Sequence, residues 1–402
     1  IHGSVELAEM LLEYAQIAVV PGAPFGAEGY VRLSYAAADD RLREAMRRLR
    51  AVLLQLDAAE AMGYNEIDQK QGNRSLGAKD GFLFYPARSA SRRGKQMKAL
   101  IYGAGSLGIV LGAYLAKGGA DIMLCNRNPA QVAALQEKGA QVTGTVEMTV
   151  PVQAVLPGDI QDRYDVIFAV VRYTQIDSIL DALRANATQN IVFVGKDVRA
   201  RALTDSLPEK NVLFAFASSA GHRERDHVAS IDLKKITIGQ ISGAPSNEAL
   251  IGRIFDGTKY RVAYEPNMED YLLCHAAFVL PAAFACYKTD GNLKKLKGNT
   301  EYLSRLIDAN IEGYRAIRSA GHAILPKSDE DFEGAAYRKT CLRFFKLMCA
   351  TSLGKICASD HAMNATDEMS ALNRDLKAFF DANGADYPVW RELEKEAGKY
   401  LS

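Results

Sequence analysis

The sequence lacks an excess of charge of either sign. Its 402 residues carry 49 Lys and Arg against 48 Asp and Glu, which leaves a formal net charge of +1. A nearly neutral chain has no global field that would attract nucleic acid or an anionic membrane. Cysteine pairs at metal-binding spacing are absent too, because the six cysteines form no CxxC motif. We therefore expect buried free thiols in a reducing compartment.

Long apolar runs and a leader pattern are also missing. No apolar run approaches the roughly 18 residues that a membrane span needs. The first residues, "IHGSVELAEM", show no basic region followed by an apolar core. We expect a cytoplasmic protein with no membrane or nucleic-acid partner. No pair of histidines has metal-ligand spacing, so we predict no metal site.

Length and composition predict several domains. Residues 57–96 are polar, basic and rich in Gly and Ser, as in "NEIDQKQGNRSLGAKDG", which is typical of a linker. Within it, "FLFY" (82–85) predicts one short strand. Residues 1–56 precede the linker and predict a small α/β fragment, with strands at 17–20 and 30–36.

After the linker, a strand pattern at 98–102 runs directly into Gly103-Ala104-Gly105-Ser106-Leu107-Gly108 and then into a helical pattern that ends at Gly118-Gly119. A GxGxxG motif between a strand and a helix predicts a dinucleotide-binding turn. The first glycine allows the tight turn, the second allows close approach of a pyrophosphate, and the third allows the helix to pack on the strand. The alternative is a glycine turn that only packs.

The end of the following strand predicts the choice of cofactor. An NAD-binding turn is usually followed, about 20 residues later, by an acid that accepts from the ribose 2′-hydroxyl. Here Asn126 and Arg127 stand instead, and they suit a 2′-phosphate. We predict NADP as the cofactor. The alternative for Arg127 is an ordinary surface arginine.

Further buried-type strands at 164–171, 190–195, 211–216 and 234–241 alternate with helical patterns, and from about residue 265 only helical patterns follow. The predicted fold is α/β: a Rossmann-type, doubly wound parallel sheet over 97–264, followed by an all-α substrate and dimerisation domain over 265–402. The cleft between the two is the expected site.

Residues 4–55 resemble the C-terminal end of class I aminotransferases. The likeness rests on "VVPG" (19–22), Phe25-Gly26, Gly29-Tyr30 and Arg32, and it implies that Arg32 corresponds to the arginine that binds a substrate carboxylate. The cofactor lysine of that family is absent from this chain, and without it no Schiff base forms. We expect a fused or residual fragment.

Residues 97–402 resemble the ketopantoate reductase (2-dehydropantoate 2-reductase) family, through "MKALIYGAGSLGIVLGAYLAKGGADIMLCNR", "DVIFAVVRYTQ" and "EGYRAIRSAGHAILP". The resemblance implies NADPH-dependent reduction of a 2-keto acid to a 2-hydroxy acid, a place in pantothenate biosynthesis, and a homodimer. It carries a cofactor-binding role to the glycine turn, to Arg127 and to Arg172.

The likeness fails at the family's catalytic positions. Its lysine on the first helix of the second domain is replaced here by Leu272 or Leu273. The asparagine after its fifth strand gives way to Gly195-Lys196-Asp197, and its late substrate-binding pattern gives way to "ASDHAMNATDEMSAL". The substrate therefore need not be ketopantoate.

Four residues are candidates for the chemistry, because reduction of a carbonyl needs a proton donor and a group that stabilises charge on oxygen. His275 is the first choice as donor and Lys196 the second, with His361 and Glu368 as further members. Each candidate has a structural alternative. His275 could be an ordinary core histidine and Lys196 a solvated loop lysine. His361 could be a surface histidine, and Glu368 an acid at a helix N-terminus. Two rival functions stay open: a non-catalytic NADP-binding sensor or structural protein, and another two-domain hydroxyacid or opine-type dehydrogenase.

Overall fold

The computed structural model describes residues 96–402 except 145, 161–162, 224–226, 259, 351–353 and 402, together with residues 11, 17, 19–21, 31–32, 48–49 and 83–84. The chain divides into two compact units, residues 1–77 and 78–402. In the first unit, β1 (Val20–Pro21) pairs antiparallel with β2 (Val31–Arg32), at the two predicted strand positions. The remainder of the predicted 1–56 fragment and the Arg32 side chain lie outside what the structure describes.

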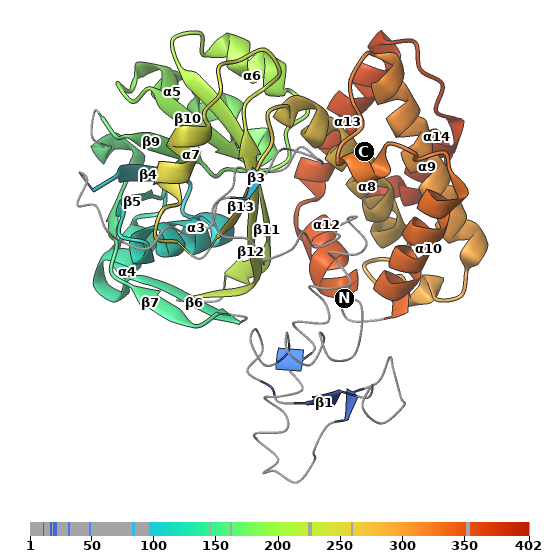
Figure 1. Ribbon diagram of the computed structural model, residues 1–402, viewed down its shortest axis with the longest axis horizontal. Helices are drawn as coiled ribbons and strands as arrows, with labels where there is room; N and C mark the ends of the chain where they lie inside the picture. The colour runs from blue at the N-terminus through green and yellow to red at the C-terminus, as the bar shows by residue number, and fades with distance from the viewer. Residues whose placement is uncertain are drawn as a thin grey trace. The chain divides into compact units, whose positions relative to one another are not determined.

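The second unit is built around one large sheet with the strand order β3-β13-β12-β11-β10-β9-β4-β5-β8 (Figure 1). From β8 to β11 all neighbours are parallel. This is the order of a doubly wound dinucleotide-binding sheet, with its topological switch point between β4 and β9. The strands are β4 (Lys98–Tyr102), β5 (Asp121–Cys125), β6 (Ala140–Gly144), β7 (Met148–Val150), β8 (Gln153–Val155), β9 (Val166–Ala169), β10 (Asn190–Val194), β11 (Asn211–Arg223), β12 (Val228–Gly239) and β13 (Arg261–Tyr264).

The far side of the sheet departs from the parallel pattern. β11 and β12 are long strands that pair antiparallel, and the outer part of β12 also pairs with β6, which pairs with β7. β3 (Leu83–Phe84) pairs antiparallel with β13, so the short strand predicted at 82–85 is present and extends the sheet.

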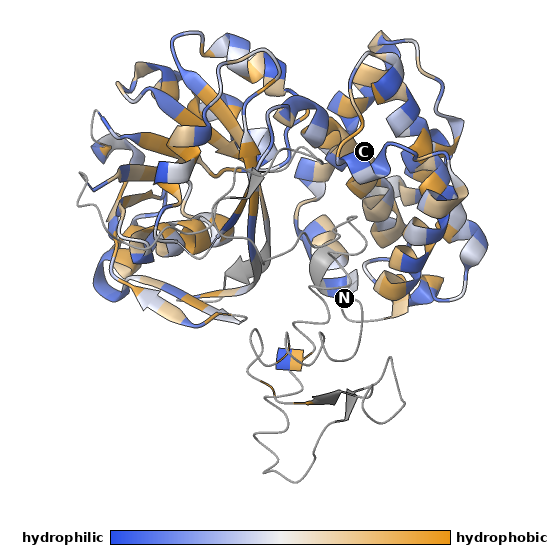
Figure 2. Cartoon of the chain, in the orientation of Figure 1, coloured by the Kyte–Doolittle hydropathy of each residue, from blue (hydrophilic) through white to orange (hydrophobic). Residues whose placement is uncertain are grey.

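The central strands are buried on both faces, as expected where helices cover a parallel sheet. Leu100, Phe193 and Phe214 belong to one apolar cluster, whereas Ile101 and Val192 belong to the other, on the opposite face. Figure 2 shows the apolar residues concentrated in these strands. The helices of this part are α3 (Ser106–Lys117), α4 (Pro129–Lys138), α5 (Leu180–Ala185), α6 (Ala200–Ser206) and α7 (Glu248–Ile254); before α5, two short 3₁₀ turns, η3 (Tyr173–Gln175) and η4 (Asp177–Ile179), replace the start of the predicted helix.

After β13 the described chain is helical, as predicted. The buried apolar residues of these helices belong to the same cluster as Leu100, Phe193 and Phe214 on one face of the sheet. Within this cluster, the Trp390 ring packs edge to face on Phe284 and on Phe380, with ring centroids 5.5 Å apart in both pairs. The helices are α8 (Met268–Lys288), α9 (Thr300–Ser319), α10 (Ala335–Ala350), α12 (Asp360–Asn364), α13 (Thr366–Ala382) and α14 (Pro388–Ala397).

One expectation about apolar runs is wrong. By length and composition alone, α8 could cross a membrane, although 72% of its most apolar 18-residue window is buried in the protein. Burial on that scale is typical of the central helix of a helical domain. The five described cysteines are free and buried, in agreement with the prediction: Cys125, Cys274, Cys286, Cys341 and Cys349.

Candidate active site

The glycine turn follows β4 and leads into α3. The backbone N–H groups of Gly103 and Ala104 both donate to the carbonyl of Cys125, at 3.1 and 2.8 Å. Gly103 has φ +109°, and a Cβ there would lie 2.2 Å from the carbonyl oxygen of Val170. A Cβ on Gly108 would lie 2.2 Å from the carbonyl oxygen of Gly103. Neither position accommodates a side chain, as the motif predicts.

Gly105 differs from both, because a Cβ there would have no atom within 4 Å. The open space lies directly before α3, whose first turn contains no acid and begins with Ser106 and Leu107. Within the described residues, no side chain caps the N-terminus of α3. Its unpaired N–H groups and its positive dipole therefore face an open position, which fits the pyrophosphate of a dinucleotide.

Asn126 and Arg127 follow β5, beside this turn. The Asn126 amide donates to the carbonyl of Ala104 (2.9 Å) and to Oε1 of Gln131 (2.7 Å), and its oxygen accepts from the backbone N–H of Asn128 (2.9 Å). Asn126 thus joins the glycine turn to the turn before α4. Arg127 is exposed, so it is the member of the pair that remains available to a phosphate.

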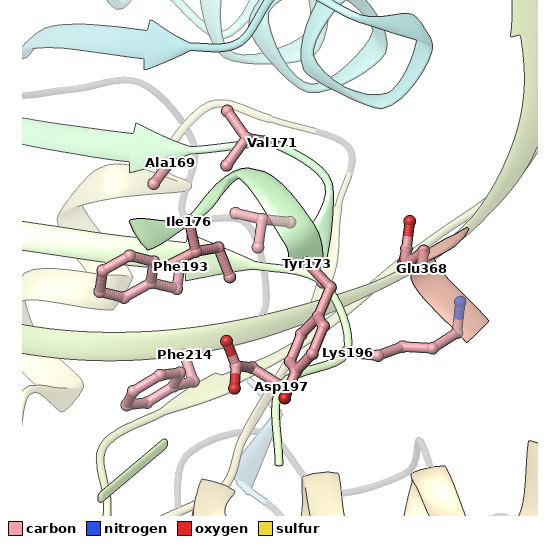
Figure 3. Close-up of a pocket in the computed structure, with 11 residues that line it drawn as sticks. Ala169, Val171, Tyr173, Ile176, Phe193, Lys196, Asp197, Phe214 and Glu368 are labelled. Carbon is pink, nitrogen blue, oxygen red and sulfur yellow. The ribbon is translucent and has the colours of Figure 1, made fainter. Parts of the chain in front are cut away.

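The candidate catalytic residues converge at the carboxyl edge of the sheet. Lys196 comes directly after β10, and its Nζ lies 2.8 Å from Nε2 of His361 on α12. Lys196 and Glu368, on the first turn of α13, both line a small cavity (Figure 3). The other lining residues are Ala169, Val171, Tyr173, Ile176, Phe193, Val194, Gly195, Asp197 and Phe214.

His275 of α8 lies against Phe216, with ring centroids 4.1 Å apart. Its Nε2 is buried and has no hydrogen-bond partner in the described part of the chain. Burial, together with the nearby Lys196 and His361, lowers the pKa of His275 to about 3. At neutral pH its imidazole is therefore uncharged.

The other three groups influence one another. Burial lowers the pKa of Lys196, and the negative charge of Glu368 opposes that effect. The Lys196 ammonium lowers the pKa of His361, so the histidine is neutral and its Nε2 accepts from the lysine. Burial raises the pKa of Glu368, against the attraction of Lys196 and Arg172. The cluster thus combines one perturbed lysine with two neutral imidazoles, a pattern common at functional sites.

Arg172 follows β9, and its Nη1 lies 3.5 Å from both carboxylate oxygens of Asp367, the residue before Glu368. Next to it, the hydroxyl of Tyr173 donates to Asp375 of α13 at 2.6 Å. Arg172 was predicted to bind the cofactor, and its side chain lies beside the candidate catalytic cluster.

A second charged network joins the loop after β10 to α13. Arg199 stacks on the Tyr173 ring at 4.6 Å and pairs with Asp177 at 3.1 Å. Burial raises the pKa of Asp197 to about 7, and its Oδ2 has no hydrogen-bond partner among the described residues. Sequence reasoning did not anticipate this network, because its members come from segments that only the fold brings together.

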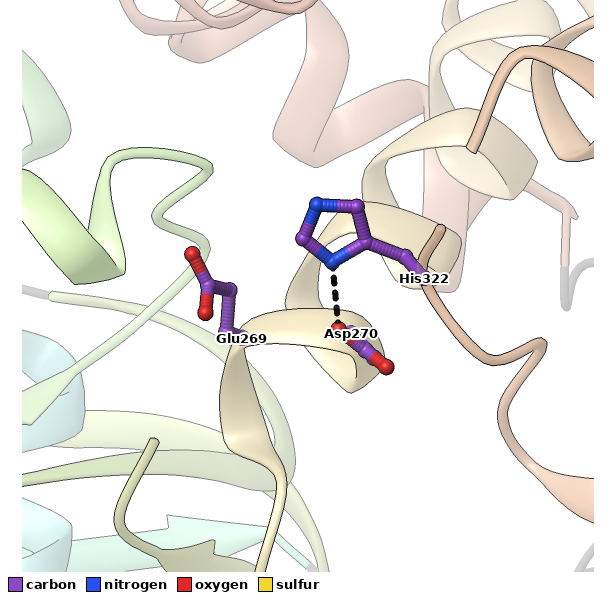
Figure 4. Close-up of side chains that lie close together, drawn as sticks. All are labelled: Glu269, Asp270 and His322. Carbon is purple, nitrogen blue, oxygen red and sulfur yellow. Dashed lines mark hydrogen bonds and ion pairs between the residues drawn. The ribbon is translucent and has the colours of Figure 1, made fainter. Parts of the chain in front are cut away.

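Near the start of α8, Glu269 and Asp270 hold their ligand atoms within 4.8 Å of one another and of His322, which would suit a metal ion (Figure 4). The protein itself engages these groups. His322 Nδ1 and Asp270 Oδ1 are 2.6 Å apart, the backbone N–H of Ala323 donates to Asp270 Oδ2 at 2.7 Å, and Glu269 pairs with Arg201 at 2.5 Å. These contacts join α8 to α6 and to the segment that follows α9.

Comparison with known proteins identifies the central part of the chain. Residues 99–243 match the family model described as "Ketopantoate reductase PanE/ApbA". Over this range the chain is similar to ketopantoate reductases. The predicted resemblance to this family is therefore confirmed over this range.

Solved structures share the fold of this domain together with the helical domain that follows it. A 2-dehydropantoate 2-reductase of Geobacter metallireducens has a TM-score of 0.64 at 17% identity, over 75% of this chain and 99% of that one. A D-mandelate dehydrogenase bound to NADH and anilino(oxo)acetate has a TM-score of 0.61 at 13% identity, over 76% and 98%.

The N-terminal stretch matches a different group of proteins. It is 52% identical over 50 residues to an aspartate aminotransferase of Streptomyces avermitilis, and 54% identical over 52 residues to one of Pyrococcus abyssi. The chain spans only 12% of the length of the first and 13% of the second. The predicted likeness to aminotransferases is confirmed for this short stretch.

Proposed function

We propose that this protein reduces a 2-keto acid to a 2-hydroxy acid with NADPH. The observation that carries the proposal is the convergence of Lys196, His361, His275 and Glu368 beside the dinucleotide-type turn. Gly103 packs against Val170 and Val171, and Val171 also lines the cavity. The proposed cofactor site and the candidate catalytic groups are therefore contiguous.

The glycine turn and the start of α3 would hold the pyrophosphate, and the exposed Arg127 would bind the 2′-phosphate. When bound, NADPH supplies a hydride to the carbonyl carbon of the substrate. Each remaining requirement falls on the protein: orienting the substrate, stabilising negative charge on its oxygen, and supplying a proton.

Lys196 is the proton donor in this proposal, ahead of His275. A histidine whose pKa is about 3 carries no extra proton at neutral pH. Lys196 has a lowered pKa, so it releases its proton more readily than a solvated lysine does. The proton moves from Nζ to the substrate oxygen, and that oxygen becomes the hydroxyl group. His361 holds Nζ in place, while neutral His275 can direct an N–H toward the same oxygen.

The test is NADPH oxidation by the full chain with pyruvate, 2-oxoisovalerate, ketopantoate, phenylglyoxylate and related acids. Lys196→Met should lower turnover on the best acid by about a hundredfold or more while NADPH still binds. Lys339→Met, at an exposed position on α10, is the matched control and should have no effect. If the wild type binds NADPH but reduces no acid, the non-catalytic interpretation replaces this one.

Cofactor preference has its own test. Arg127→Ala should weaken NADPH binding by on the order of tenfold, as expected for a lost charge-assisted contact, and should leave NADH binding nearly unchanged. Equal losses for the two cofactors would contradict the assignment.

We also propose that the protein is a cytoplasmic homodimer. A structurally similar ketopantoate reductase of Staphylococcus aureus, with a TM-score of 0.60 at 13% identity over 76% of this chain and 99% of that one, is described as dimeric. Light scattering coupled to size exclusion would measure the mass, and a monomer at micromolar concentration would contradict the assembly.

A further inference from the structure

The geometry points to Arg172 as the residue that binds the carboxylate of the substrate, with the carboxylate of Asp367 occupying the guanidinium in the absence of substrate. The inference rests on the proposed function and names the residue that makes the enzyme selective for acids. It restricts the enzyme to free 2-keto acids, to the exclusion of 2-keto amides, esters and simple aldehydes.

Arg172 adjoins the cavity from two sides. Along the chain it follows Val171, which lines the cavity. Through space it contacts Asp367, whose neighbour Glu368 also lines the cavity beside Lys196. After Lys196 and burial, the positive charge of Arg172 contributes to the lowered pKa of His361, and it opposes the burial that raises the pKa of Glu368, in agreement with a guanidinium close to these groups.

The contact between Arg172 and Asp367 is weak. Nη1 lies 3.5 Å from both oxygens, and the two side chains are 53% and 54% exposed. Exposed ion pairs of this kind contribute little to stability. A guanidinium has five N–H donors, and these contacts use Nη1 alone. Arg172 can therefore exchange Asp367 for a substrate carboxylate at low cost.

The other arginine near this cavity is more firmly held. Arg199 pairs with Asp177 at 3.1 Å, lies 3.7 Å from Asp197 and 3.9 Å from Asp375, and stacks on Tyr173. Moving its side chain would remove the cation beside the buried Asp197, which would keep only the backbone N–H of Arg199, and such a loss is costly. Arg172 is therefore more readily available than Arg199 to bind a ligand.

The chemistry of a 2-keto acid explains why an anchor is needed at this position. Its carbonyl carbon is bonded directly to its carboxylate, so the proton donor and the carboxylate-binding group must flank one small region. Lys196 and Arg172 follow the adjacent parallel strands β10 and β9, at the same edge of the sheet. A guanidinium binds a carboxylate through two parallel hydrogen bonds, which fixes the orientation of the carbonyl as well as its position.

The experiment compares the best acid of the panel with its primary amide, in the wild type and in three variants. Arg172→Gln should raise KM for the acid by about tenfold to a hundredfold, the effect of losing a hydrogen bond to a charged group, with little change for the amide. Asp367→Asn should lower KM for the acid several-fold, because Arg172 then loses its competing partner. Arg338→Gln removes an exposed pair with Asp308 on distant helices, and it should change neither substrate.

Opposite shifts from Arg172→Gln and Asp367→Asn are the expected result, since general damage to the fold would not produce them. If Arg172→Gln weakens NADPH binding and leaves KM for the acid unchanged, Arg172 belongs to the cofactor site and the inference is overturned. It is also overturned if Arg172→Gln affects acid and amide equally. If the wild type reduces neither compound, the proposed function fails and the anchor fails with it.

Discussion

Gly105 and Gly108 should respond differently to substitution by alanine: one variant should lose cofactor affinity and the other stability. Gly108→Ala should destabilise the fold, whereas Gly105→Ala should leave the fold intact and weaken NADPH binding. The reason is the space around each Cα. At Gly108 a Cβ would lie 2.2 Å from the carbonyl oxygen of Gly103 and 3.1 Å from Cγ2 of Ile101, while at Gly105 it would meet nothing within 4 Å.

The magnitude for Gly108 follows from two opposing effects. The clash is with a backbone atom, which cannot rotate away, so α3 must shift from β4; overpacking of this kind costs about 3 kcal/mol at the upper end of its range. Alanine gains about 1 kcal/mol over glycine inside a helix. The net loss is about 2 kcal/mol, or about 3 °C in melting temperature for a unit of this size.

At Gly105 the backbone is already extended, with φ −79°. Alanine is therefore tolerated and should change the free energy of unfolding by less than about 1 kcal/mol. Its methyl group would stand where the pyrophosphate approaches the N–H groups of α3. Loss of such charge-assisted contacts should cost on the order of tenfold or more in NADPH affinity.

Thermal and denaturant unfolding would measure stability, and titration of NADPH fluorescence would measure affinity. Gly119→Ala serves as a control, because it has φ +100° in open space and should show only backbone strain of about 1–2 kcal/mol with unchanged affinity. The reasoning is refuted if Gly105→Ala binds NADPH as well as the wild type, or if Gly108→Ala is as stable as the wild type.

Three further predictions concern pH and the ends of the fold. Turnover should fall as pH rises through the lowered pKa of Lys196, and the pH profile should show no histidine ionisation between about pH 5 and 8. This fall at alkaline pH should be absent from the residual activity of Lys196→Met. An ionisation near pH 6.5 would instead favour a histidine as the donor. Asp270 raises the pKa of His322, so His322→Ala should cost about 1–2 kcal/mol below pH 6.5, and denaturant unfolding should show that loss shrinking as pH rises through the folded pKa. A chain beginning at Met97 should bind NADPH like the full chain but melt at a lower temperature, because it loses the pairing of β3 with β13; aggregation would show that the preceding residues belong to the fold.

Local sequence signals predicted much of the fold. The strand, glycine turn and helix at 98–117 are recognisable from sequence because the motif requires glycine at fixed positions for steric reasons. The order of strands and helices along the chain indicates a doubly wound sheet. The reversal of β12 was not predictable in this way. A strand buried on both faces has the same apolar pattern whether it runs parallel or antiparallel to its neighbour.

The candidate site shows a different limit. Residue type and position after a strand were enough to nominate Lys196, and polar surroundings were enough for His361, but nothing local indicates that the two meet across 165 residues of sequence. The same holds for Arg172 and Asp367, which are 195 residues apart. Such pairings depend on how the helical domain packs against the sheet.

The position of His275 suits a proton donor, whereas its protonation state at neutral pH does not. From sequence it was the preferred donor, because a histidine ordinarily titrates near neutral pH. The fold does bring it to the cluster, yet the burial that places it there, with Phe216 on its ring and Lys196 nearby, lowers its pKa to about 3. Burial also lowers the pKa of Lys196, and Lys196 in turn lowers the pKa of His361 to about 3. In the proposed mechanism the proton therefore comes from Lys196, and the imidazoles, which are neutral near pH 7, orient it or share the charge that develops on the substrate oxygen.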